Sequence, residues 1–374
     1  MLKYLTAGES HGEAIIAILE GMVSGLKVSS SVINRELKRR MQGYGRGERM
    51  GLEKDAVNII SGLKNGATLG SPIAMVVNNK DFSISSLNAL SSPRPGHADL
   101  AGALKYGHKD LRNILERASA RETVARVSVG TVCKILLMEF GIDILSHVVM
   151  IGGVEAHTKD LTFDELRTLA EKSPARCADE AATKLMCEEI DNAKDAGDTL
   201  GGAFEILVKN VPPGLGSHVQ WDRKLDGNLA RSLMSIQAIK GVSVGLGAIA
   251  ARRRGSQCHD EIIYIRERGF SRKTNNAGGI EGGISNGEEI VLRAYMKPIA
   301  TLKRPLRSVD IKTKKQAKAE VERADITAVP AAGVIGEAVT AFEIANAMCV
   351  KFGGDSLSEM KRNFEGYLEQ VKEF

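Results

Sequence analysis

The chain has 374 residues, of which 39 are glycine, and its aromatic residues make up only 4%. Hydrophobic residues at 43% and charged residues at 26% are typical of a globular protein with a substantial core. The net charge of +5 is too small for a typical nucleic-acid-binding protein, and five scattered cysteines argue against a disulfide framework or a structural zinc site.

Apolar periodicity and capping residues predict helices and strands that alternate without a repeat. In chain order, these are a helix that ends at Arg39-Arg40, a strand at 73–77, a helix over 124–138 that stops at Gly141, a helix opened by Thr162, a helix-and-loop excursion over 172–198, strands at 204–208, 261–266 and 290–296, and a last helix opened by Ser356.

No linker rich in Ser, Pro or Gly divides these elements, so we expect one domain over residues 1–374, of α+β or mixed α/β type. Long basic or glycine-rich loops interrupt it at 42–54, 91–99, 271–289 and 297–320, and loops of that length are usually functional or mobile. The start of the chain has no signal-peptide pattern, and its apolar run at 14–19 is far below the ~18 residues of a membrane span. We therefore expect a soluble, cytoplasmic protein that contacts no membrane.

Two histidines lie in short loops rich in small residues. His11 is the fourth residue of Gly8-Glu9-Ser10-His11-Gly12, and His97 is the fourth of Arg94-Pro95-Gly96-His97-Ala98-Asp99. Imidazole gives and takes protons near neutrality, so the two loops suggest proton transfer beside a bound anion. Taken singly, each motif is also typical of a plain surface turn.

Arginine and glycine alternate after the first predicted helix, in Gly43-Tyr44-Gly45-Arg46-Gly47-Glu48-Arg49. Guanidinium groups bind carboxylates and phosphates through two donors at once, and glycine lets backbone N–H groups take part. The segment 116–123, at a predicted helix start, adds Arg117 and Arg121. A solvated basic loop, and ion pairs along a helix surface, remain the alternatives.

The glycine surplus suggests backbone that approaches another group closely. The glycine pairs 278–279 and 282–283, followed by a strand that ends at Lys297, are consistent with a cofactor approached by backbone, although hairpin turns explain them nearly as well. Residues 245–250 fit G-x-G-x-x-A, but Arg252-Arg253-Arg254-Gly255 follows almost at once and Asp260 comes too early for a ribose ligand. We therefore reject a dinucleotide-binding fold there.

Together these motifs closely resemble the chorismate synthase family, from the Gly8–Gly12 pentapeptide to Lys351-Phe352-Gly353-Gly354-Asp355-Ser356. The resemblance also includes Asp198-Thr199-Leu200-Gly201-Gly202. It implies helices sandwiched between antiparallel β-sheets in a single large domain with long active-site loops, assembled as a homotetramer. It implies a lyase of aromatic amino acid biosynthesis that converts 5-enolpyruvylshikimate 3-phosphate to chorismate by 1,4-anti elimination of phosphate, the last step of the shikimate pathway. Reduced FMN is the implied cofactor, with NADPH as a candidate reductant for it.

The resemblance also implies roles for single residues. His11 near the substrate and His97 near the flavin handle protons, and Asp325 helps the flavin to accept the proton removed from the substrate. The implied substrate or NADP contacts are Ser10, Arg40, Arg46, Arg49 and Arg121. The implied flavin contacts are Arg117, Ala118, Ser119, Gln237, Ala238, Gly282, Lys297, Pro298, Ile299, Ala300, Thr301 and Arg323. No metal ligand is implied.

The chain departs from the family pattern in three places. Arg323-Ala324-Asp325 stands where Arg-Ser-Asp or Arg-His-Asp is usual, Gln237-Ala238-Ile239-Lys240 stands where Pro-Ala-Val-Lys is usual, and residues 241–245 lack a customary Glu. These changes bear on the flavin contacts near Gln237. Two other functions remain: a flavoprotein oxidoreductase with another anionic substrate, and an RNA-binding module, for which only Tyr44 and Tyr106 could stack on bases.

Overall fold

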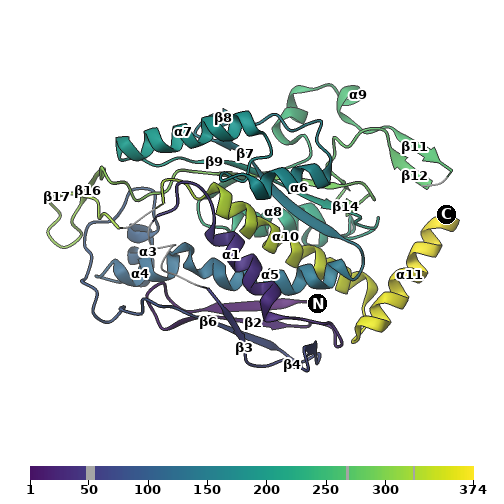
Figure 1. Ribbon diagram of the computed structural model, residues 1–374, viewed down its shortest axis with the longest axis horizontal. Helices are drawn as coiled ribbons and strands as arrows, with labels where there is room; N and C mark the ends of the chain where they lie inside the picture. Colours follow the sequence, from purple (N-terminus) through teal and green to yellow (C-terminus); the bar gives the residue numbers. More distant parts are fainter. Residues whose placement is uncertain (48–54, 267–268, 323–324) are drawn as a thin grey trace.

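The computed structural model describes residues 1–47, 55–266, 269–322 and 325–374. Two antiparallel sheets enclose a layer of helices (Figure 1). The first sheet has the order β1 (Lys3–Ala7), β2 (Ala14–Glu20), β6 (Ile73–Asn78) and β3 (Val57–Ile59). The second has the order β10 (Ile239–Val244), β15 (Ile290–Met296), β9 (Gly202–Lys209), β7 (Asp143–Ile151) and β8 (Val154–Glu155). The predicted sandwich is confirmed.

Three helices fill the space between the sheets: α1 (Ser30–Met41), α5 (Thr123–Met138) and α10 (Val329–Phe352). Helix α5 packs on β2 and β6 of the first sheet, and α10 packs on β7 and β9 of the second. Helix α6 (Phe163–Lys172) packs on β7 from the other face of the second sheet, beside α7 (Glu180–Ala196) (Figure 1). The main hydrophobic core therefore lies between the two sheets, around α5 and α10.

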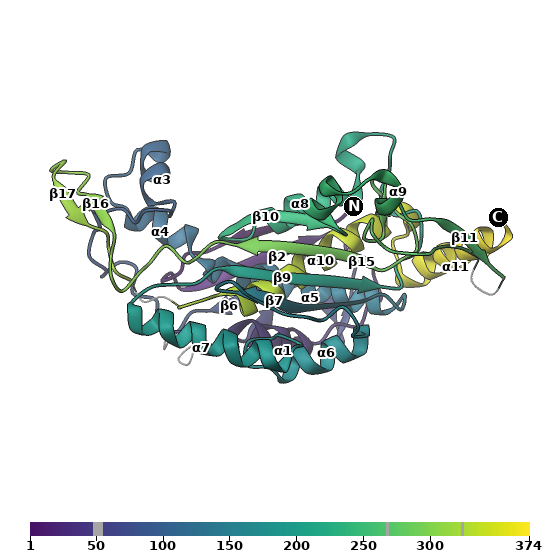
Figure 2. The same cartoon turned by 90° about the horizontal axis from the view of Figure 1, so that it is seen from above.

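Shorter elements surround this sandwich. The other α-helices are α3 (Asp99–Tyr106), α4 (Arg112–Ala118), α8 (Leu225–Met234), α9 (Gly255–Cys258) and α11 (Leu357–Glu373), and the 3₁₀ turns are η1 (Ala120–Glu122), η2 (Trp221–Arg223) and η3 (Gly247–Arg252). Four small hairpins pair β4 (Leu63–Lys64) with β5 (Ala67–Thr68), β11 (Ile262–Ile265) with β12 (Gly269–Arg272), β13 (Ile280–Glu281) with β14 (Ile284–Ser285), and β16 (Arg307–Val309) with β17 (Gln316–Lys318). Figure 2 shows α3, α4 and the β16–β17 hairpin at one end of the molecule, and α9 and β11 at the other.

Glycine brings α10 close to its neighbours. A Cβ on Gly130 of α5 would lie 2.4 Å from the carbonyl oxygen of Ala338, and a Cβ on Gly336 would lie 2.6 Å from the ring of Phe204. The contacts of α10 with α5 and with β9 therefore both need glycine. Part of the glycine surplus serves helix packing, beyond the ligand-approaching backbone that we expected from the sequence.

The elements predicted by capping residues agree closely with the structure. Thr162 forms a complete capping box with Glu165 at the start of α6, and Ser356 accepts the N–H of Glu359 at the start of α11. The sequence analysis did not predict α10, whose residues are apolar on nearly all sides. This helix has the length and apolarity of a membrane span, but 78% of its apolar window is buried within the fold, as expected of a core helix.

The rejection of a dinucleotide site at residues 245–250 agrees with the local structure. A 3₁₀ turn, η3, follows Gly245 where a dinucleotide-binding fold would have an α-helix. A Cβ on Gly245 would lie 2.1 Å from the carbonyl oxygen of Asn276, so this glycine lets two segments of backbone pack together.

Candidate functional site

Two arginines from distant parts of the chain pair with one buried carboxylate, and a third arginine lies beside them. Arg40, in the last turn of α1, donates from Nη2 to Asp55 Oδ2 at 3.0 Å, and Arg121, in η1, donates from Nη1 to Asp55 Oδ1 at 2.6 Å. Arg46 lies near enough to Arg40 to act on its charge. We call Arg40, Arg46, Arg121 and Asp55 the arginine cluster. The structure thus brings together arginines that the sequence placed in separate motifs.

Positive charge exceeds negative charge in this cluster. Burial lowers the pKa of Arg40 to about 10, and the charges of Arg46 and Arg121 act in the same direction against the opposing effect of Asp55. The buried Nε atoms of Arg40 and Arg46 have no hydrogen-bond partner among the described residues. Buried donors without acceptors and a surplus of positive charge suit a polyanionic ligand.

Asp325 joins the cluster from the segment that precedes α10. Its Oδ2 lies 2.6 Å from Arg46 Nη1, and its Oδ1 accepts the backbone N–H of Gly47 at 2.7 Å. The carbonyl oxygen of Gly45 accepts the N–H of Ile326, so two loops far apart in the sequence are paired at this point. Two further candidates, Arg49 and Arg323, lie outside the residues that the structure describes.

His11 lies against a buried glutamate. Its Nδ1 is 2.9 Å from both carboxylate oxygens of Glu116, and its backbone N–H donates to Glu116 Oε2 at 2.8 Å. Burial alone would raise the pKa of Glu116, but these hydrogen bonds from His11 lower it overall. An ionised carboxylate only accepts, so Nδ1 of His11 carries a proton and Nε2, 3.9 Å from Asp81, is the nitrogen that can exchange one.

His97 has the same arrangement with Asp99, the first residue of α3. The two side chains meet at 2.5 Å between Nδ1 and Oδ1, and Arg94 donates from Nε to Asp99 Oδ2 at 2.8 Å. Burial would raise the pKa of Asp99, but His97 and Arg94 lower it well below its ordinary value. Arg94 also donates to Thr301 Oγ1 at 2.9 Å, which links the His97 loop to the segment after β15.

The segments expected to contact flavin lie beside these groups. Arg117 donates to the carbonyl oxygens of Gly8 and Thr6, and Ser119 Oγ lies 3.2 Å from Ser10 Oγ. Gln237 donates to Glu122 of η1 at 3.3 Å. Arg117 and Ser119 therefore border the His11 loop, and Ala118 lies between them.

Backbone pairing connects Gln237 to the strand that ends at Lys297. The N–H of Lys297 donates to Ala238, whose φ of 68° is a left-handed conformation that is strained for a residue with a side chain. Lys297 Nζ donates to the carbonyl oxygen of Gly96 at 2.7 Å, next to His97. Neither Lys297 nor Arg117 pairs with a carboxylate among the described residues, so both keep a charge for an anion.

Most of the sequence candidates therefore form one connected ring of segments. Residues 298–300 join it through Ile299, whose carbonyl oxygen accepts Thr199 Oγ1 at 2.7 Å. Gly282 lies apart from these segments. Its hairpin contacts Leu225 at the start of α8, whereas Gln237 follows the end of α8, about 15 Å away along that helix.

Three carboxylates of this site were not predicted from the sequence. Asp55 is an isolated residue outside every motif, whereas Glu116 and Asp99 were part of motifs but were given no role. A carboxylate within the same motif as a candidate histidine is the signal that could have identified Asp99. Nothing local to residue 55 marks Asp55, since its role depends on two arginines distant in sequence.

Comparisons with known proteins agree on one family. The sequence model of the family described as chorismate synthase matches residues 2–349. Chorismate synthase of Geobacter sulfurreducens is 55% identical and that of Pelobacter propionicus 56% identical, each over 100% of both chains. A crystal structure of chorismate synthase superposes with a TM-score of 0.84 at 46% identity, covering 100% of this chain and 99% of that one.

These matches cover the whole site as well as the fold. They confirm the resemblance drawn from the motifs. The chain belongs to the chorismate synthase family and is a carbon–oxygen lyase that eliminates phosphate from 5-enolpyruvylshikimate 3-phosphate to form chorismate.

Proposed function

We propose that the substrate binds over the arginine cluster and reacts between His11 and His97, with reduced FMN bound along Arg117–Ser119, Gln237–Ala238 and Lys297–Thr301. The observation that carries this proposal is the arginine cluster itself, in which Arg40 and Arg121 share the carboxylate of Asp55 and Arg46 pairs with Asp325, so that three guanidinium groups face two carboxylates among the described residues. A substrate with two carboxylates and a phosphate would supply the missing negative charge.

Arg40, Arg46 and Arg121 bind the anionic groups of the substrate, and Ser10 contributes a hydroxyl beside them. As the phosphate leaves, negative charge develops on its oxygen atoms. Donors that are already in place stabilise this charge without having to reorganise, which lowers the barrier more than the same donors would in water. Arg49 belongs to the same proposed set.

The flavin segments suit a planar, anionic cofactor. The strained backbone at Ala238 and the uncompensated charges of Arg117 and Lys297 fit such a group. When bound, reduced FMN supplies electron density transiently and recovers it, so that the reaction has no net redox change. Arg323 and Gly282 complete the proposed contact set.

Proton handling is assigned to His11, His97 and Asp325. Glu116 and Asp99 hold Nδ1 of the two histidines. Nε2 of His11 is left to exchange a proton, and Nε2 of His97, which lies 3.3 Å from Arg94 Nη2, is its proposed counterpart. The carboxylate of Asp325, held by Arg46 and by the N–H of Gly47, assists removal of the substrate proton. Each residue thus acts from a position fixed by a neighbour.

We further propose a cytoplasmic homotetramer whose flavin is reduced by NADPH or by a separate reductase. The placement of Gly282 suits assembly, because the hairpin that carries it lies about 15 Å along α8 from Gln237. A neighbouring copy could bring its own Gly282 to the flavin.

The test is an anaerobic assay with 5-enolpyruvylshikimate 3-phosphate and chemically reduced FMN, in which chorismate and phosphate are followed together. We expect both products in equal amounts, and about a hundredfold lower kcat/KM for Arg40→Lys, which cannot donate through two nitrogens. Arg35→Lys, an exposed change on the same helix, is the control. Absence of phosphate release, or NAD(P)H consumed in step with product, would contradict the proposal.

A further inference from the structure

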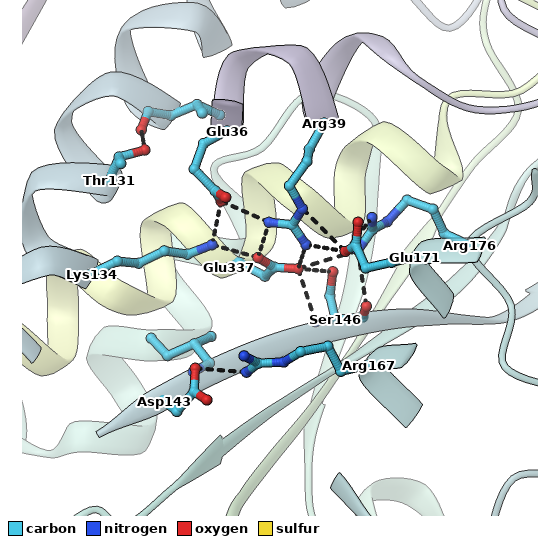
Figure 3. A network of polar contacts seen from close by, with 12 residues as sticks. Glu36, Arg39, Thr131, Lys134, Asp143, Ser146, Arg167, Glu171, Arg176 and Glu337 are labelled. Atoms are coloured by element: carbon cyan, nitrogen blue, oxygen red, sulfur yellow. Dashed lines mark hydrogen bonds and ion pairs between the residues drawn. The ribbon is translucent and has the colours of Figure 1, made fainter. Parts of the chain in front are cut away.

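A buried ion network lies behind the arginine cluster, at the contact of α1, α5, α10 and β7 (Figure 3). Its centre is Glu337 of α10, whose side chain is completely buried. Glu337 accepts hydrogen bonds from Arg39 of α1, from Lys134 of α5, and from both the N–H and the hydroxyl of Ser146 on β7. A single carboxylate thus joins four elements.

Arg39 uses its whole guanidinium group in this network. Its Nη1 lies 2.7 Å from Glu36 and 2.8 Å from Glu337, and its Nη2 lies 3.0 Å from Glu337 and 2.5 Å from Glu171. Its Nε also donates to Glu171 at 3.1 Å. With three carboxylates around it, the side chain of Arg39 is held in one position, and the last turn of α1 is held with it.

The surrounding backbone is built tightly around the network. Arg176 adopts a left-handed φ of 56°, and its Nη1 and Nη2 donate to Glu171 and to the carbonyl oxygen of Ser146. A Cβ on Gly333 of α10 would lie 2.9 Å from the hydroxyl oxygen of Ser146. A strained residue and an obligatory glycine indicate that the positions of these groups are closely constrained.

Such a network is a weak source of stability. Removing a carboxylate from water costs free energy that buried ion pairs often only offset, and well-packed apolar residues can do as well. The protein nevertheless keeps three acidic groups, Glu36, Glu171 and Glu337, and three cations, Arg39, Lys134 and Arg176, at this contact. Its benefit therefore lies in the geometry that it enforces.

The network is covalently connected to the arginine cluster. Arg40 directly follows Arg39 and turns the other way, to Asp55 and Thr123. Thr123 begins α5, which also carries Lys134, and Asp325 lies four residues before α10, which carries Glu337. Each of the three helices that meet at Glu337 thus leads to a group of the cluster.

We propose that Glu337 is a positioning residue for substrate binding: through Arg39 it fixes the last turn of α1, which carries Arg40, and through Lys134 it ties α5, whose opposite end begins beside Arg121. It thereby sets the spacing of Arg40 and Arg121 around Asp55. It does not touch the substrate. This inference rests on the proposed role of the arginine cluster. It makes Glu337, on the opposite side of α1, responsible for where the arginines of the cluster lie.

The test compares Glu337→Gln with Arg39→Met, which removes the same tie from its other end. For both variants we expect KM for 5-enolpyruvylshikimate 3-phosphate to rise about tenfold or more while kcat changes little, because a displaced guanidinium group weakens binding. Affinity of the flavin-free protein for inorganic phosphate, measured by calorimetry, should fall in parallel. The double variant should bind substrate and phosphate no less tightly than the more impaired of the two single variants, since both substitutions remove the same contact.

Glu343→Gln is the matched control, because it removes another buried carboxylate from the same helix, one that pairs with Ser232 and Arg231 on the far side of the core. It should leave KM and phosphate affinity unchanged.

A normal KM in Glu337→Gln, or additive effects in the double variant, would overturn the inference. If Arg40→Lys binds substrate normally, the proposed cluster fails and this inference with it; if only the Glu337 and Arg39 variants bind normally, the inference alone fails. Should Glu337→Gln not fold, Arg39→Met carries the test.

Discussion

Arg40 and Arg121 share one carboxylate: each donates to a different oxygen of Asp55, at 3.0 Å and 2.6 Å. All three side chains are buried. Asp55 thereby holds two like charges together that would repel one another without it. With Asp325 on Arg46, two carboxylates face three guanidinium groups among the described residues, and this imbalance leaves room for an anionic substrate.

Replacing this shared carboxylate should make the protein depend on anions. In Asp55→Asn we expect the free energy of unfolding to fall by about 3 kcal/mol, because buried guanidinium groups lose their partner. Inorganic phosphate should recover more stability in the variant than in the unchanged protein, which thermal unfolding with and without phosphate would measure. Asp222→Asn, at an exposed position, is the control. Equal responses to phosphate in the variant and the unchanged protein would contradict the expectation.

Glu116 should matter for the rate rather than for cofactor binding. In Glu116→Gln the imidazole of His11 loses its charged partner, and its proton can move to the other ring nitrogen. We expect kcat to fall about a hundredfold, the usual size of a lost acid–base contribution, with FMN affinity unchanged. Anaerobic chorismate formation and flavin titration measure the two effects. Glu139→Gln, which breaks a surface pair with Lys361, should change neither.

Substitution of His97 or Asp325, the other residues proposed to handle protons, should likewise affect the rate more than FMN affinity. For His97→Ala and Asp325→Asn we expect chorismate formation to slow by about a hundredfold or more, while FMN binding weakens far less. Single-turnover assays under saturating FMN would separate the two quantities. Normal turnover in both variants would mean that neither residue handles a proton.

The free energy of unfolding should fall on acidification because Glu116 and Asp99, the carboxylates paired with the two histidines, become protonated. Hydrogen bonding to His11 and His97 keeps the pKa values of Glu116 and Asp99 below their ordinary 4.5 and 3.8, against the effect of burial. Groups with a lowered pKa stabilise the fold above their ordinary pKa, and this contribution is lost as pH falls below it. Urea unfolding at pH 7, 5 and 3 should show the loss begin between the last two values, and it should continue below pH 3 because the pKa of Asp99 lies far below its ordinary value.

Glu343 should contribute to stability with the opposite pH dependence. Burial raises its pKa, so its neutral form favours the fold and its stabilising contribution is lost as pH rises. Glu343→Gln should therefore be more stable than the unchanged protein at pH 7, and the difference should shrink toward pH 4.5. A pH-independent difference would contradict burial as the cause.

Local signals predicted much of the fold. Capping residues identified the starts of α6 and α11, and alternation identified β9, in which Phe204, Ile206 and Val208 are buried. Leu207 is buried too, because α6 covers the other face of β7 and β9. Alternation describes one face of a strand and says nothing of a helix that will cover the other. The same limit applies to α10, whose apolar pattern has no polar face to mark it as a helix.

The site was predictable where a motif carries the chemistry and not where partners are distant. His11, His97 and Arg46 lie in short motifs of small and charged residues, which can be recognised singly. Asp55 and Glu337 act on residues far away in the sequence, so the fold alone defines them. A lone glutamate in an apolar run is still a signal in itself: Glu337 interrupts such a run at 329–342, and a charge placed there needs partners.

The position of α10 in the chain affects how the protein can be made. This helix fills the space between the two sheets, yet it is encoded by residues 329–352, after every strand of both sheets. During synthesis, α5 soon follows the first sheet and can cover it, whereas the inner face of the second sheet leaves the ribosome before α10, the helix that covers it. The nascent chain must hold this apolar face uncovered until residues 329–352 have emerged, and only then can Arg39 reach Glu337.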